Sequence, residues 1–204
     1  MTIEQVKVFE FDELDEEVQE KILDRNRDIN TDHPDWYWCV YDDAKAIGKI
    51  MGMDIDHIHF SGFWNQGDGA MFLGRYEYKK GAYKEILSYA PIDDGLHSIA
   101  KRLQEIQRRN FYALTATITR SYSGRSYSHE NMMEIDVTRY TPDMVEETDI
   151  DNDTVDNLTD VLKDFARWIY TRLWDEYECR TTDDAVKETL EANGYRFTEN
   201  GDIW

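Results

Sequence analysis

The chain has 204 residues, with 43 acidic and 23 basic side chains, a formal net charge of −20, and 41% apolar and 13% aromatic residues. This apolar and aromatic content excludes a wholly disordered chain, because disordered segments lack the residues that build a core. The negative charge argues against direct contact with nucleic acid and favours a protein partner with a basic surface.

The charge is unevenly distributed along the chain. Residues 1–74 carry 17 acids and 6 bases, residues 75–125 carry 5 acids and 10 bases, and residues 126–204 carry 21 acids and 7 bases. Two acidic arms therefore flank a basic middle segment. The basic segment could also dock an acidic arm of a second copy, which would give a homodimer.

The chain has the composition of a cytoplasmic protein. Its two cysteines, Cys39 and Cys179, lack CxxC spacing, which is typical of a reducing compartment. The N-terminus shows no basic region followed by an apolar one, and no apolar run reaches the length of a membrane span. We therefore expect no membrane association.

The first fifty residues predict a short strand and two helices. Residues 6–11 alternate in polarity like a strand. A helix capped by Asp12 or Asp15 should follow, and a second should open at Pro34 and end near Gly52. Both helices carry apolar residues at helical spacing, so we expect them to pack together.

The central segment predicts an antiparallel sheet. Residues 54–63 and 70–78 read as one hairpin, and residues 111–121 and 127–138 as a second, with a helix after Asp94 between them. Helices before and after such a sheet indicate an α+β fold with four or more antiparallel strands.

The C-terminal third is predicted to be helical. An apolar stripe runs from residue 155 to 173, and a shorter helix over 183–194 precedes Asn200-Gly201, a strong hairpin signal. We expect an α+β lobe over residues 1–140 and an acidic helical lobe over 141–204 that ends in this hairpin. One continuous domain is the alternative.

The candidate partner-binding residues are acidic. Residues 141–160 contain eight acids and no base. We expect the contact to involve Asp143, Glu146, Glu147, Asp149, Asp151, Asp153 and Asp156, with a second patch of Glu13, Asp15, Glu16 and Glu17. A solvated loop that caps a helix is the plainer alternative. Asp149, Asp151 and Asp153 also match the first ligands of a calcium loop, but Thr154 stands where such a loop needs glycine.

The other site motifs are weak. His57 and His59 share one side of a strand but have no third ligand, and His129 points away from the neighbouring Ser128. No dinucleotide or P-loop motif is present. We therefore expect no catalytic residue, cofactor or metal.

Aromatic residues offer two further candidate surfaces. Phe63 and Trp64 lie in a predicted turn, where they could anchor a partner or fold back into the core. Basic residues also lie near tyrosines in the middle segment, as on RNA-binding faces, although the total charge opposes this use. These residues are Arg102, Arg108, Arg109, Arg120 and Arg125 near Tyr112, Tyr122 and Tyr127.

Four segments, FEFDELDEEVQEKILDRNRD, FSGFWNQGDGA, LHSIAKRLQEIQ and SGRSYSHENMM, resemble a family of small acidic proteins of tailed phages and prophages that is loosely labelled antitoxin-like. The similarity spans most of residues 8–135. The resemblance implies a location in the cytoplasm of a bacterial host cell. It transfers no catalytic motif. Accessory phage genes of this size often encode inhibitors of host defence, including anti-CRISPR and anti-restriction proteins.

The magnitude of the charge is compatible with mimicry of DNA. A compact chain of this length has a diameter of roughly 40 Å. Duplex DNA of that length presents about 20–25 phosphate charges. We therefore expect a non-enzymatic inhibitor that binds a basic, nucleic-acid-handling surface, with an antitoxin that neutralises a toxin by direct contact as the alternative.

Overall fold

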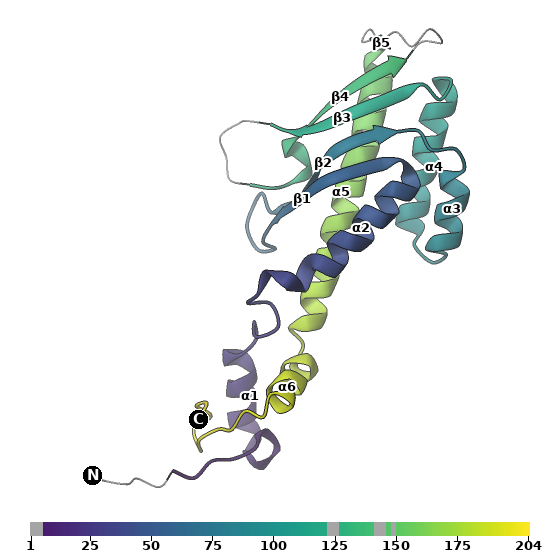
Figure 1. The fold of residues 1–204 in the computed structure, drawn as a ribbon. Helices are drawn as coiled ribbons and strands as arrows, with labels where there is room; N and C mark the ends of the chain where they lie inside the picture. The colour runs from purple at the N-terminus through teal and green to yellow at the C-terminus, as the bar shows by residue number, and fades with distance from the viewer. Residues whose placement is uncertain (1–5, 122–126, 141–145, 148–149) are drawn as a thin grey trace. The chain divides into compact units, whose positions relative to one another are not determined.

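The computed structural model describes residues 6–121, 127–140, 146–147 and 150–204 (Figure 1). The chain divides into two compact units: unit 1 comprises Met1–Trp38 and Trp174–Trp204, and unit 2 comprises Cys39–Leu173. The sequence predicted lobes over 1–140 and 141–204 instead. The difference arises because the two ends of the chain pair with each other. Among the described residues, no helix is long and apolar enough to cross a membrane.

Unit 2 is built on an antiparallel meander, which confirms the predicted α+β fold. The strands follow the order β1 to β5, and each pairs with the next one along the chain. Their bounds are β1 (Met53–Ser61), β2 (Gly69–Glu77), β3 (Leu114–Arg120), β4 (Met133–Tyr140) and β5 (Glu146–Glu147). Both predicted hairpins are present.

The sheet has one covered face and one open face. Met53, Tyr76, Ala116 and Val137 form a row across four strands, and all four are buried. The next row consists of Asp54, Arg75, Thr117 and Asp136, and all four are exposed. Since successive residues of a strand point to opposite faces, this alternation means that only one face of the sheet carries helices.

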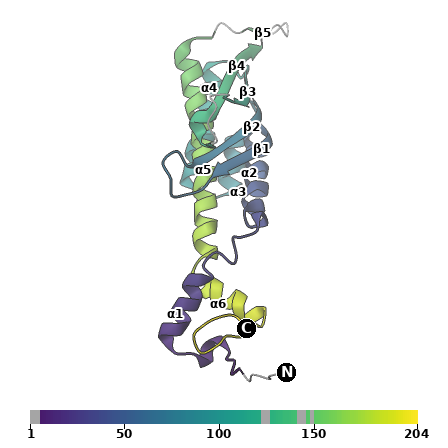
Figure 2. The same ribbon diagram turned by 90° about the vertical axis from the view of Figure 1, so that its left-hand side faces the viewer.

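The helices of unit 2 pack on the covered face, and α5 runs along it in both views (Figures 1 and 2). The ring of Phe165 meets Phe72 of β2 edge-on at 5.6 Å. Asp93 accepts from Leu96 N at the start of α4 and from Trp168 Nε1 of α5, both at 2.9 Å, so one carboxylate caps a helix and joins two. The bounds are α2 (Trp38–Met51), α3 (Ala82–Tyr89), α4 (Asp94–Arg109) and α5 (Asn152–Arg180).

A strained turn connects α4 to β3. The predicted strand over 111–121 begins only at Leu114, because Phe111 and Tyr112 have positive φ angles of 56° and 62°. Gln107 is fully buried, and its side chain donates to Leu114 O at 2.7 Å and accepts from Leu114 N at 3.2 Å. Tyr112 N also donates to Gln107 O at 2.7 Å. These bonds hold the turn in a conformation that residues other than glycine rarely adopt.

Unit 1 joins the two ends of the chain. Phe9 and Phe197 form an antiparallel bridge, with Phe9 N to Phe197 O at 2.8 Å and Phe197 N to Phe9 O at 3.0 Å. The predicted strand over residues 6–11 is therefore reduced to a single bridge, and Phe11–Glu13 form a 3₁₀ turn instead. The short core contains Phe11, Leu14, Ile22, Val186, Leu190 and Phe197.

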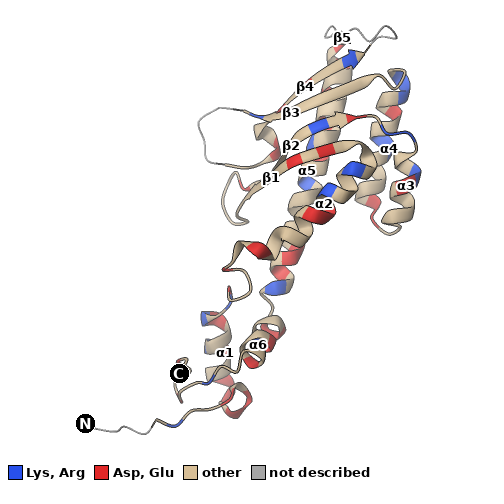
Figure 3. Cartoon of the chain, viewed as in Figure 1, with Lys and Arg blue, Asp and Glu red and all other residues tan. Residues whose placement is uncertain are grey.

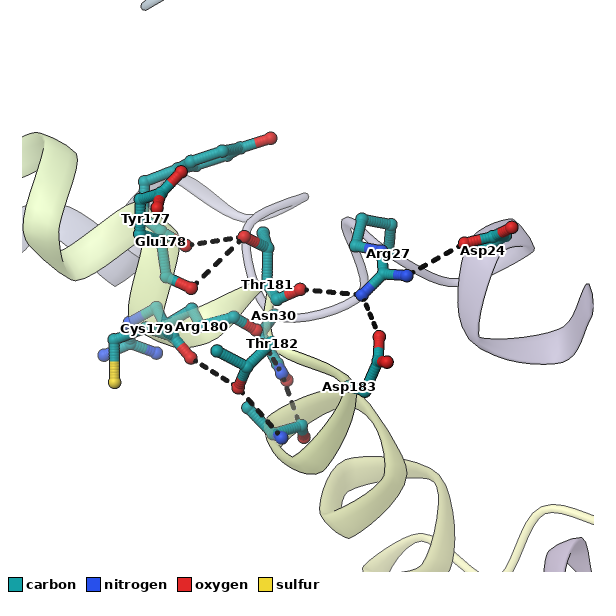
Figure 4. Close-up of polar contacts among 11 residues, drawn as sticks. Asp24, Arg27, Asn30, Tyr177, Glu178, Cys179, Arg180, Thr181, Thr182 and Asp183 are labelled. Atoms are coloured by element: carbon teal, nitrogen blue, oxygen red, sulfur yellow. Dashed lines mark hydrogen bonds and ion pairs between the residues drawn. The ribbon is translucent and has the colours of Figure 1, made fainter. Parts of the chain in front are cut away.

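Helices α1 (Glu16–Arg25) and α6 (Asp183–Ala192) flank this core. Polar contacts tie the segment after α1 to the chain before and within α6 (Figure 4). Asn30 Nδ2 donates to Arg180 O at 3.0 Å and to Ala185 O at 3.2 Å, and Asn30 Oδ1 accepts from Thr189 at 2.7 Å. The predicted hairpin at Asn200-Gly201 is also confirmed, because Phe197 bridges Ile203.

The turn allows a direct test of its strain. Phe111→Gly should raise the free energy of unfolding by roughly 0.5–1 kcal/mol, because glycine adopts positive φ freely and the Phe111 ring is 90% exposed. Chemical denaturation of both proteins measures the change. Phe63→Gly, at a position without positive φ, is the control and should lower the free energy of unfolding. An equal decrease in both variants would show that the turn at Phe111 is not strained.

Candidate functional site

The negative charge is concentrated in unit 1. Its 69 residues contain 21 acids and 7 bases, a net charge of −14, whereas the 135 residues of unit 2 contain 22 acids and 16 bases, a net charge of −6. Figure 3 marks the acidic residues in red on α1 and α6. The two ends of the chain thus bring their carboxylates into one small unit.

Six of the seven bases of unit 1 are already in ion pairs within that unit. Arg27 binds both Asp24, at 2.8 Å, and Asp183, and these two carboxylates raise the pKa of the Arg27 guanidinium (Figure 4). The other pairs are Lys21–Glu17, Arg25–Asp202, Arg180–Glu176, Lys187–Asp12 and Arg196–Glu10. Because these cations are engaged, exposed carboxylates such as Asp15, Glu16, Asp184 and Glu188 form no ion pair with a described residue.

The predicted N-terminal patch contains two kinds of acid. Structural acids cap a helix or form an ion pair, and uncommitted acids are exposed and do neither. Glu13 accepts from Glu10 N at 2.9 Å in a capping box, and Glu17 pairs with Lys21 at 2.8 Å, which lowers the pKa of the Glu17 carboxyl. Asp15 and Glu16 are exposed and take part in no ion pair among the described residues. These two carboxylates are therefore available to a partner.

The predicted acidic stretch of residues 143–156 is partly described. Asp143 and Asp149 lie outside the described residues, and Glu146 and Glu147 form β5 beside Tyr140 and Arg139. Asp153 and Asp156 lie in the first two turns of α5, which Asp151 precedes.

Asp151 acts as a helix cap, which was the plainer alternative. Its carboxylate accepts from Thr154 N at 2.8 Å, and hydrogen bonds from Thr154 lower the pKa of the Asp151 carboxyl. A lowered pKa means that this contribution to stability is present above the pKa of the unfolded chain and is lost as the pH falls through the folded value. Asp153 and Asp156 are exposed and have no ion-pair partner within the described part of the chain.

Sequence patterns did not indicate that the acids of α6 belong to the same unit as the N-terminal acidic patch. Asp184 and Glu188 are exposed in unit 1, which also contains the N-terminal patch. They are far from residues 13–17 in the sequence, and only the pairing of the chain ends brings them into the same unit. No local motif could have indicated this.

The aromatic loop between β1 and β2 exposes a tryptophan. Trp64 is 70% exposed, which contradicts the alternative that it fills the core. The Asp68 carboxylate accepts from Trp64 N at 2.9 Å and Asn65 N at 2.7 Å, so the loop has a defined shape. Phe63, in contrast, packs between Phe60 and Tyr170, with ring centres 5.7 and 5.5 Å away.

The histidines form no metal centre in the described part of the chain, where no group of three or more His, Cys, Asp or Glu side chains is arranged to hold a metal. The rings of His57 and His59 lie 6.2 Å apart. Burial, together with the nearby Arg120 and His57, lowers the pKa of His59. This favours the neutral form of the ring.

These features describe an α+β domain with an open sheet face, joined to a smaller acidic unit. Residues 36–183 match the model of a family described as a domain of unknown function, DUF8835, and the chain belongs to that family. The matched range contains all of unit 2 and leaves most of unit 1 outside. No curated protein and no solved structure matches the chain.

Structural and uncommitted acids should respond differently to substitution. Asp151→Ala should lower the free energy of unfolding by clearly more than an ordinary surface substitution does, because it removes the cap of α5. Asp156→Asn, about one turn further along α5, should change it by less than about 0.5 kcal/mol. Urea denaturation at neutral pH measures both, and similar losses for the two variants would contradict the distinction.

Proposed function

We propose that this protein is a non-enzymatic inhibitor whose acidic surface binds a basic, nucleic-acid-handling surface of another protein. The main contact involves the exposed carboxylates of unit 1, among them Asp15 and Glu16. The exposed acids at the start of α5 in unit 2, Asp153 and Asp156, are a second candidate patch. The target class is a bacterial defence protein, such as a nuclease or a subunit of a CRISPR effector. The inhibitor acts in the host cytoplasm and needs no cofactor.

One observation carries the proposal. Unit 1 has a net charge of −14, and six of its seven bases are engaged in ion pairs with its own acids. Such a density of negative charge destabilises a compact unit through self-repulsion. A basic partner would relieve this repulsion, and complementary charge would accelerate association and disfavour wrong partners.

The phage resemblance supports the choice of target class. Proteins that handle nucleic acid present basic channels to a polyanion, and an array of carboxylates can occupy such a channel in its place. The carboxylates that cap helices or pair with local bases contribute less to such a contact, because they are already engaged. The proposal therefore depends on the exposed acids that have no cation of their own.

The test is a comparison of three variants in a pull-down from nuclease-treated bacterial lysate. A variant with Glu13→Gln, Asp15→Asn, Glu16→Gln and Glu17→Gln should bind the captured target at least tenfold more weakly, and salt should weaken wild-type binding steeply. A second variant with Asp153→Asn and Asp156→Asn measures the contribution of α5.

The control removes four exposed acids elsewhere, with Asp42→Asn, Asp43→Asn, Asp54→Asn and Asp56→Asn. It should bind the target nearly as tightly as the wild type. Purified wild-type chain should also block binding of nucleic acid by the target. Salt-independent affinity, equal weakening by all variants, or a captured protein that handles no nucleic acid would reject the proposal.

An antitoxin is the second candidate function, and the exposed Trp64 supports it. A tryptophan that is 70% exposed in a loop of defined shape is a typical anchor for a partner protein. Trp64→Ala should weaken neutralisation of a toxin encoded by a neighbouring gene by at least tenfold. Growth rescue in cells that express the toxin measures this. Trp38→Ala, at another exposed tryptophan, is the control and should rescue growth as the wild type does. Undiminished rescue by Trp64→Ala would show that the loop between β1 and β2 is not the toxin-binding surface.

A further inference from the structure

Aromatic side chains gather at one end of the sheet of unit 2. Tyr78 directly follows β2, Tyr112 precedes β3, and Tyr140 ends β4, so the three stand at the same end of neighbouring strands. The rings of Tyr78 and Tyr112 lie 4.6 Å apart. Together with Phe111 these residues are called the aromatic edge.

The aromatic edge borders a shallow depression on the sheet. The depression has a volume of about 610 Å³, and the three tyrosines line it together with Arg75 and Glu77. Thr115, Thr117 and Thr138 add hydroxyl groups. This volume lies within the ordinary range for small-ligand sites, and ring faces, one cation, one carboxylate and hydroxyls are all available in it.

The aromatic edge is held rigidly at a cost to the fold. Phe111 and Tyr112 both have positive φ, and the buried Gln107 holds their turn in place. Phe111 is 90% exposed, so its ring contributes almost nothing to the core. Two strained residues that expose aromatic rings are difficult to explain by stability alone, and strain of this kind is concentrated at functional sites.

The segment that contains most of the aromatic edge has an excess of bases, in contrast to the rest of the chain. Residues 75–120 contain nine bases and five acids. Arg75, Lys80, Arg108 and Arg109 are exposed, and none of them forms an ion pair with a described residue. At physiological ionic strength, salt largely screens interactions between exposed charges that are more than about 8 Å apart. Nearby charges therefore affect a ligand at this edge more than the total charge of −20 does.

From this combination we infer that the aromatic edge binds single-stranded nucleic acid. Bases stack on Phe111 and Tyr112, and the phosphates lie near Arg75, Arg108 and Arg109. Glu77 and the threonine hydroxyls offer hydrogen bonds to base edges. A single strand fits better than a duplex, because a duplex keeps its bases stacked on each other. An acidic peptide would use the arginines but not the exposed rings.

This inference goes beyond the proposed inhibitor function and uses a different surface. The sequence-based expectation of no direct contact with nucleic acid rested on the total charge of the chain. Exposed bases such as Arg75, Arg108 and Arg109 supply unpaired cations in this segment, although Asp54 and Asp136 also lie on the open face of the sheet. A polyanion can therefore be attracted to this edge even though most of the chain repels it.

The test uses labelled oligo(dT) and oligo(U) of about 12 nucleotides and a duplex of the same length, with binding measured by fluorescence anisotropy on the full chain. At least one single strand should bind at least tenfold more tightly than the duplex. Binding of oligo(U) alone would identify RNA as the ligand. Phe111→Gly should weaken strand binding about tenfold, and Arg108→Ala with Arg109→Ala should weaken it and flatten its salt dependence.

The control variants separate binding from folding. Phe111→Gly is expected to stabilise the protein, so a loss of affinity in this variant cannot come from unfolding. Tyr89→Ala removes another exposed tyrosine, on α3, and should bind as the wild type does. The fourfold acidic variant of residues 13–17 should also bind strands normally, so this test and that of the inhibitor function can fail separately.

Three results would overturn the inference. The first is that neither single strand binds at low salt. The second is that the duplex binds as tightly as the strands. The third is that polyglutamate displaces the strands while Phe111→Gly retains full affinity, which would identify the edge as a site for acidic protein segments.

Discussion

Pairing of the two chain ends is the interaction on which the distribution of charge depends. The bridge between Phe9 and Phe197 and the contacts of Arg27 and Asn30 with the chain around α6 bring two acidic segments into one small unit. The core of this unit is short, and its ion pairs engage six of its seven bases. What is left over is an exposed surplus of carboxylates, and this surplus is the basis of the proposed binding surface.

The same acidic residues serve two purposes that sequence alone does not separate. Asp93 and Asp151 cap helices, and Glu13 and Glu17 satisfy local donors or bases. Such acids stabilise the fold, because helix N-termini favour negative charge and supply unpaired N–H groups. Acids such as Asp15 and Asp156 have no such local role among the described residues. A count of acids therefore overstates the surface available to a partner.

Unit 2 combines a sheet that helices cover on one face only with an aromatic edge whose rings are exposed. Helices bury one face through contacts such as that between Phe72 and Phe165, which leaves the other face open. At the end of the sheet, the buried Gln107 fixes a strained turn that exposes Phe111. The family match covers all of unit 2, so the open face and the aromatic edge belong to the part of the chain that defines the family.

The sequence by itself determined both hairpins, the α+β class and every described α-helix except α3, because apolar periodicity and turn residues are local signals. It also indicated that helices begin near Asp15 and Asp94 and that a terminal hairpin forms at Asn200-Gly201. Only the tertiary structure decided that residues 1–38 and 174–204 form one unit, that Trp64 is exposed, and that Phe111 and Tyr112 form a strained turn rather than a strand. The physical reason is that each of these features depends on contacts between residues far apart in the chain, or on a buried side chain such as Gln107 that overrides local backbone preference.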